Sequence, residues 1–194
     1  VMSRNGSGVW SIVNKAKAND GQANDHLGYS VSIYNTEIAA GAPDQDFDAA
    51  GGSALTDAGA VYSFMRVSGV WSQTQKMVAA DRKAGDKFGF SVSRFNSSVS
   101  IGAPYQDYTT GVSNLASNAG AVYLFNKNGT WSQHQKLTTS DRQINDNFGY
   151  SVAMSAHDIV AGAPFDDHSS PSILLDAGSI YVFNPMPGNT WAQR

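Results

Sequence analysis

The stretch FGFSVSRFNSSVSIGAP, residues 88–104, decides the fold. Small polar and apolar side chains alternate on both sides of Asn96 and Ser97. Alternation with a period of two predicts β-strands, and short polar residues between two such runs predict a hairpin. Proline has no N–H to give to a neighbouring strand, so Pro104 ends the second run. The stretch therefore predicts two antiparallel strands joined by a tight turn.

The same pattern occurs three times in the chain. LGYSV, FGFSV and FGYSV begin at Leu27, Phe88 and Phe148, and each is followed by Gly-Ala-Pro. All four tryptophans keep the same interval of 60 or 61 residues: Trp10, Trp71, Trp131 and Trp191. Self-similarity at a fixed period predicts a repeat architecture. The period divides the chain into the end of a preceding repeat (residues 1–9), three repeats (residues 10–70, 71–130 and 131–190) and the start of a next repeat (residues 191–194).

Each repeat is predicted to form four short strands. In the middle repeat these are residues 71–79, 88–95, 98–103 and 121–126, grouped as one small antiparallel sheet. One such sheet cannot bury both of its faces alone, and radial stacking of several sheets solves this problem. The sequence therefore predicts an all-β fold, a β-propeller of four-stranded antiparallel blades with about three blades per chain.

Composition narrows the classes of partner. The 194 residues are 41% hydrophobic and 15% charged and include 19 glycines, which is typical of turn-rich β structure. The net charge is −3 and the lysines and arginines do not cluster, so no nucleic-acid partner is expected. No apolar run approaches the length of a membrane span, so no membrane insertion is expected. Cysteine is absent, which excludes disulfides and thiolate metal sites.

The motifs FG-x-SV, GAP, AG-x-VY and W-x-Q-x-QK together resemble the FG-GAP repeat of integrin α chains and related surface proteins. The resemblance covers nearly the whole chain. It implies a β-propeller, an extracellular or cell-surface location, and a lectin-like or adhesive role.

The family's calcium loop lies between FG-x-SV and GAP and needs several closely spaced carboxylates. Here that link is only residues 34–37, 95–98 and 155–158. We therefore expect no integrin-type metal site and no cofactor, and at most weak calcium binding elsewhere.

The long links of each repeat are the predicted working surface, because binding residues concentrate on long loops held by a rigid scaffold. They are residues 19–26, 80–87 and 140–147, together with the loops that follow each Gly-Ala-Pro. Aromatic and acidic side chains after the prolines are the predicted ligand contacts, where an aromatic ring beside carboxylates suits a sugar. These candidates are Asp46, Phe47, Tyr105, Asp107, Tyr108, Phe165, Asp167 and His168.

Six further aspartates recur at fixed positions of the first link: Asp20, Asp25, Asp81, Asp86, Asp141 and Asp146. They have two interpretations. They accept backbone N–H groups within turns, or they hold a weak cation. Repetition in every repeat favours the first interpretation, because every turn must fold whereas a ligand rarely needs all of them.

These observations predict a non-catalytic extracellular binding module that recognises a glycan or a cell-surface protein. The alternative is a self-assembling scaffold, or a fragment of a larger propeller without a ligand of its own. An enzyme is not expected: Gly28-Tyr29-Ser30-Val31-Ser32 lacks the final glycine of a nucleophile elbow, and no helix follows it. Three blades leave open sheet edges, so the chain is also predicted to form a homodimer or a higher oligomer that completes a ring.

Overall fold

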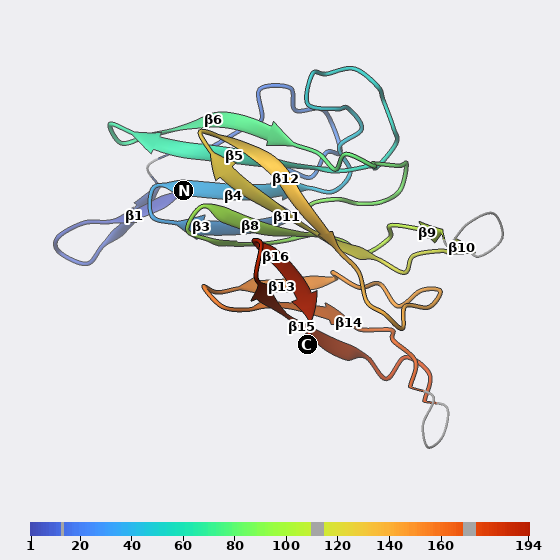
Figure 1. Ribbon diagram of the computed structural model, residues 1–194. Coiled ribbons are helices and arrows are strands. Elements are labelled where there is room, and N and C mark those ends of the chain that lie inside the picture. Colours follow the sequence, from blue (N-terminus) through green and yellow to red (C-terminus); the bar gives the residue numbers. More distant parts are fainter. Residues whose placement is uncertain (13, 110–114, 169–173) are drawn as a thin grey trace.

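The computed structural model describes residues 1–12, 14–109, 115–168 and 174–194, which form strands and turns. In these ranges no helix is long and apolar enough to cross a membrane. Three four-stranded antiparallel sheets dominate the structure (Figure 1), and we call them blades 1, 2 and 3. Blade 1 contains β3 (Ser30–Tyr34), β4 (Glu37–Ala42), β5 (Ala60–Val67) and β6 (Val70–Met77). Blade 2 contains β7 (Ser91–Phe95), β8 (Ser98–Ala103), β11 (Ala121–Asn128) and β12 (Thr130–Leu137). Blade 3 contains β13 (Ser151–Met154), β14 (Ile159–Ala163), β15 (Ser179–Met186) and β16 (Thr190–Gln193).

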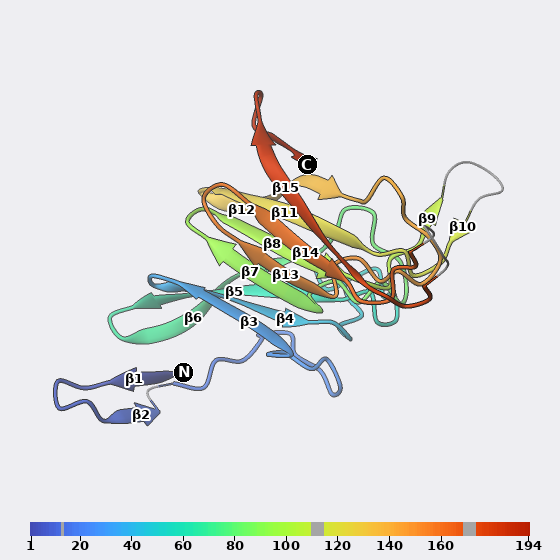
Figure 2. The ribbon, with the colours of Figure 1, turned by 90° about the horizontal axis from the view of Figure 1, so that it is seen from below.

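Two short strand pairs complete the described elements. β1 (Met2–Arg4) pairs with β2 (Trp10–Ile12), and β9 (Tyr108–Thr109) pairs with β10 (Leu115–Ala116). Figure 2 shows the β1–β2 hairpin lying apart from the three blades.

The blades are offset by one strand from the sequence repeats. The strand at Trp71 was grouped with the strands that follow it, but in the structure it is part of β6 and pairs with β5. The cause is turn length. Ser68 and Gly69 both adopt positive φ, which suits a tight hairpin between β5 and β6. Residues 78–90 are too many for such a turn, so the chain crosses there to the next blade. The period of the sequence and the boundary of the sheet therefore fall at different places.

The blades stack face to face, as predicted for a propeller. The first strands of the blades, β3, β7 and β13, lie side by side. Between blades 1 and 2, Val61 and Met77 pack in one buried cluster with Ile101 and Tyr123. Between blades 2 and 3, the corresponding cluster includes Val122, Leu137, Ile159 and Phe183. This arrangement confirms an all-β fold consistent with three propeller blades.

The FG and GAP glycines allow neighbouring blades to touch through their backbones. A Cβ atom on Gly41 would lie 1.9 Å from the carbonyl oxygen of Gly89, and one on Gly102 would lie 1.9 Å from that of Gly149. The serine of FG-x-SV bonds across the same contact: the Oγ of Ser30 donates to the Gly89 oxygen at 2.7 Å. The two parts of the motif, far apart in sequence, are thus one inter-blade contact.

Candidate functional site

The long connections gather at one end of the blades, on the right in Figure 1, and the described crossovers pack on the loops of the preceding blade. The loop between β4 and β5, residues 43–59, contacts the crossover of residues 78–90. The Arg82 guanidinium donates to the carbonyl oxygen of Ser53 at 2.8 Å. The Gly85 N–H donates to that of Thr56 at 2.8 Å. The end predicted to be the working surface is therefore a continuous layer of interlocked loops.

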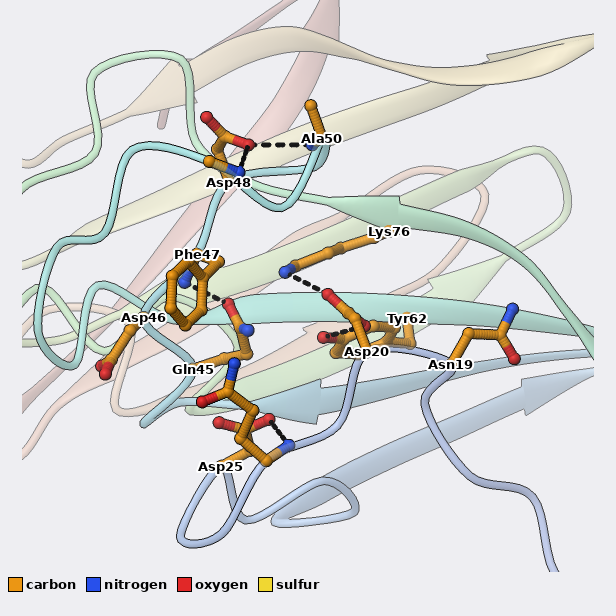
Figure 3. Close-up of polar contacts among 12 residues, drawn as sticks. Asn19, Asp20, Asp25, Gln45, Asp46, Phe47, Asp48, Ala50, Tyr62 and Lys76 are labelled. Carbon is orange, nitrogen blue, oxygen red and sulfur yellow. Dashed lines mark hydrogen bonds and ion pairs between the residues drawn. The ribbon is translucent and has the colours of Figure 1, made fainter.

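The first repeated aspartate of each long link, Asp20, Asp81 or Asp141, accepts a hydrogen bond from a tyrosine of the blade. The hydroxyl of Tyr62 donates to Asp20 at 2.9 Å, and that of Tyr123 donates to Asp81 at 2.9 Å. Lys76 also donates to Asp20, at 2.7 Å (Figure 3). Burial and then the hydrogen bond to Asp20 raise the pKa of Tyr62 far above its ordinary value. In blade 3 the Tyr181 hydroxyl lies 3.2 Å from Asp141 and 3.0 Å from Asp166.

The second repeated aspartate of each long link, Asp25, Asp86 or Asp146, makes a hydrogen bond within its own crossover loop. The carboxylates of Asp25 and Asp86 accept the backbone N–H of the residue three positions earlier, both at 2.7 Å, and Asp146 makes the same contact with Gln143. All three aspartates are buried. Burial raises the pKa of Asp86 to about 6 and that of Asp146 to about 6, although the N–H donors act in the opposite direction.

The aspartates after the prolines close the loop between the middle strands of each blade. Asp46 accepts the N–H of Asp57 at 2.8 Å. Asp107 and Asp167 make the same contact with Asn118 and Asp176, at 3.0 and 2.8 Å. Each repeated aspartate thus has a partner within the chain. In the part of the chain that the structure describes, no group of three or more His, Cys, Asp or Glu side chains could hold a metal ion.

Three of the predicted aromatic contacts have other partners within the chain. The Phe47 N–H donates to the side chain of Gln45 at 2.7 Å (Figure 3). The Tyr108 ring is covered by the guanidinium of Arg142, 3.5 Å from the ring centroid. The imidazole of His168 lies 3.0 Å from the Ser179 hydroxyl.

The other two candidates join a row of five aromatic rings that crosses all three blades. The x residues of FG-x-SV form its spine: Phe90 lies 4.9 Å from Tyr29 and 4.7 Å from Tyr150, between ring centroids. Tyr105 meets Phe90 edge-on at 6.0 Å, and Phe165 meets Tyr150 edge-on at 6.2 Å. Tyr29 is 55% exposed, Tyr150 38% and Phe165 43%. We call these five residues the aromatic row.

A charged group borders the aromatic row. The carboxylate of Asp44 accepts from both His26 and Lys87, and Lys87 also reaches Asp57 at 2.9 Å. Burial acts to raise the pKa of Asp44, but the hydrogen bonds from Lys87 and His26 outweigh it and the pKa is lowered. Burial and then the neighbouring Tyr150, Tyr105 and Asp44 raise the pKa of Tyr29. Rings and fixed polar groups therefore share one surface.

Sequence reasoning missed the spine of this row. In the sequence, Tyr29, Phe90 and Tyr150 only marked the repeated motif. The alternation of side chains around them is equally compatible with a buried position, so it did not identify them as surface residues. The available signal was that this position is aromatic in all three copies while its neighbours are small.

Comparison with known proteins identifies a family of repeats. No curated protein matches the chain. The FG-GAP repeat matches it three times in tandem, at residues 10–64, 71–125 and 131–183. These matches cover most of the chain, and each contains one copy of the Gly-x-Ser-Val and Gly-Ala-Pro motifs. FG-GAP repeats are typically non-catalytic and typical of extracellular or cell-surface proteins. The chain belongs to the FG-GAP repeat family.

Proposed function

We propose that the protein is an extracellular, non-catalytic binding module that recognises carbohydrate through the aromatic row. FG-GAP repeats suggest a propeller binding module. The single observation that carries the proposal is the continuous row of five partly exposed rings across three blades.

Sugar rings have an apolar face and a rim of hydroxyl groups. Aromatic side chains stack on the apolar face, and a few fixed polar groups bond to the hydroxyls and set the orientation. Tyr29, Tyr150 and Phe165 offer exposed rings, and Asp44 with His26 and Lys87 offers fixed polar atoms beside them. A cell-surface protein is the second candidate, because the row spans several blades and aromatic residues are enriched in protein interfaces.

Glycan-array screening followed by calorimetry with the best-bound sugar tests the proposal. Phe90→Ala removes the central ring, so we expect binding roughly tenfold weaker or lost. Phe95→Ala is the matched control: Phe95 ends β7, the strand that begins directly after Phe90, and packs against Tyr34 at 5.4 Å. It should bind like the wild type. An array without signal above background, or equal loss in both variants, would contradict the carbohydrate proposal.

A further inference from the structure

We propose that a cleft between blades 1 and 2 binds an oxyanion group, a carboxylate or a sulfate. The cleft has a volume of about 260 Å³ and is lined by the turns after β3 and β7 and by Glu37, Arg94 and Lys127. We call these three residues the ionic triad. The volume is below that of pockets for drug-sized ligands, so the cleft suits a small charged group.

The cleft and the aromatic row lie at opposite ends of the same strands. Tyr29 and Phe90 precede β3 and β7, whereas Tyr34 and Phe95 end these strands beside the short turns. The two blades that form the cleft pack on each other within the chain. The proposal is therefore independent of any ligand of the aromatic row.

The charges of the cleft do not follow the sequence repeat. Arg94 stands at the position of Ile33 in blade 1 and Met154 in blade 3. Glu37 stands at the position of Ser98 in blade 2. The Arg94 side chain is only 4% exposed, and burying a charge costs far more than burying an aliphatic side chain. The fold of a blade therefore does not require this arginine, which points to a role in binding.

The ionic triad contains more cations than anions. The Glu37 carboxylate accepts hydrogen bonds from both Arg94 and Lys127. Burial acts to raise the pKa of Glu37, but the hydrogen bonds from Lys127 and Arg94 outweigh it and the pKa is lowered. One ionised carboxylate beside two cations leaves one positive charge in excess. In the other ion pairs of the described residues, every lysine has at least one carboxylate of its own.

The Arg94 guanidinium also keeps unused donors. Its Nη2 donates to Glu37 and, at 3.2 Å, to the carbonyl oxygen of Asn96. Among the described residues its Nε and Nη1 have no hydrogen-bond partner. A guanidinium has five N–H donors in a planar fork, and this geometry matches the oxygens of a carboxylate or a sulfate. Excess positive charge and unused donors therefore meet in one cleft.

The cations are held in place before a ligand arrives. The Trp131 ring lies under both of them, with its centroid 5.0 Å from the Arg94 guanidinium carbon and 5.8 Å from the Lys127 ammonium. The Lys127 N–H donates to the Ser97 carbonyl oxygen at 2.8 Å, which ties its strand to the turn after β7. Lys127 is 25% exposed, so it is the cation that an entering anion meets first.

Polar side chains of the two turns line the rest of the cleft. They are Asn35, Thr36, Asn96 and Ser97. Their amide and hydroxyl groups suit the hydroxyl groups of a sugar acid, in which the oxyanion is attached to a sugar ring. A free inorganic anion is the other source of the same chemical group.

Calorimetric titration with sodium sulfate and with sodium glucuronate tests the proposal, at an ionic strength kept constant with sodium chloride. We expect binding at one site. Sulfate alone would identify a free anion as the ligand, and tighter binding of glucuronate would identify a sugar acid; both results support the site. Phe90→Ala removes the central ring of the aromatic row and should leave the affinity for both anions unchanged.

Lys127→Gln removes the excess positive charge and a charged donor, so both anions should bind roughly tenfold more weakly or not at all. Arg66→Gln is the matched control. Arg66 stands at the position of Lys127 in blade 1, is exposed and is not among the residues that line the cleft. The same change in net charge should therefore leave binding unchanged. Circular dichroism checks that both variants fold.

Glu37→Gln should act in the opposite direction. It removes the carboxylate that competes for Arg94 and Lys127 and leaves two partly buried cations without their anion. The variant should melt at a lower temperature than the wild type in chloride. Sulfate should bind to it more tightly than to the wild type and should restore its melting temperature.

Three results would overturn the proposal. The first is the absence of binding by both sulfate and glucuronate. The second is equal weakening in Lys127→Gln and Arg66→Gln, which would show an unspecific attraction to net charge. The third is a Glu37→Gln variant that sulfate does not stabilise, which would show that the ionic triad only holds the two blades together.

Discussion

The buried aspartates of the crossover loops are the residues most sensitive to pH. Asp86 has a pKa of about 6 in the folded chain, against an ordinary value of 3.8. The folded state therefore binds more protons than the unfolded state between about pH 4 and pH 6, and stability falls as the pH rises through this window. Asp44 and Glu37 have lowered pKa values, so they act in the opposite sense, at pH values below about 4.

Asp86→Asn should raise the free energy of unfolding at pH 7 by on the order of 2 kcal/mol, because it removes a buried charge. The asparagine oxygen can still accept the Lys83 N–H. The variant should also lose part of the decline in stability between pH 4.5 and pH 7, while Asp146 retains its share. Urea denaturation at several pH values measures both effects. Asp176→Asn, at an exposed position, is the control. An unchanged slope in Asp86→Asn would contradict this explanation.

Within a blade, tight turns join neighbouring strands. Between blades, close contacts at glycines set the spacing of the sheets. Gly102 in β8 lies against Gly149 of the next blade, so the size of one side chain sets the distance between two sheets. Gly162 has the same place in blade 3 but no described segment lies across from it. The two positions therefore separate the effect of the inter-blade contact from that of the local backbone.

Gly102→Ala should destabilise the chain by at least about 2 kcal/mol, because the new methyl group would overlap the Gly149 backbone. Gly162→Ala should cost less than about 1 kcal/mol in the single chain, since the Ser151 hydroxyl can rotate away. Thermal and chemical unfolding of both variants measures the difference. Equal losses would mean that the close approach between blades does not set stability.

Contacts between neighbouring blades provide most of the tertiary structure of the whole molecule. Blade 2 packs both of its faces against the blades beside it. The outer face of blade 1 packs in part against Ala16, Ala18 and Leu27, and Val31 and Ile180 stay exposed on the outer faces of blades 1 and 3. The free energy released when these faces are covered adds to the stability of the fold. Self-association, which the sequence predicts, should therefore add to the stability of the fold.

The melting temperature of the wild type should consequently rise with protein concentration, because association stabilises only the folded state. Val31→Asp should melt at the same temperature at every concentration, close to the wild type at high dilution. Differential scanning calorimetry over a range of concentrations checks this. A wild-type melting temperature that does not depend on concentration would argue against coupling.

Much of the fold could be predicted from local patterns. The alternation around Asn96, the recurring tryptophans and the Gly-Ala-Pro triplets determine the strands, the repeat and the all-β class. The interpretation of the repeated aspartates as acceptors of N–H groups in turns also agrees with the contacts of Asp86 and Asp46. These features depend on residues close together in the chain, so their spacing is visible in the sequence.

The sequence by itself therefore determined the all-β class, the four strands of each repeat and their repetition. Only the tertiary structure decided that β6 belongs with β5, that Tyr29, Phe90 and Tyr150 form one row, and that Gly41 and Gly102 lie against Gly89 and Gly149 of the next blade. Each of these facts joins residues of different repeats. These residues lie close together because whole blades stack on one another. The distance between residues of two stacked blades cannot be predicted from the pattern of side chains within one repeat.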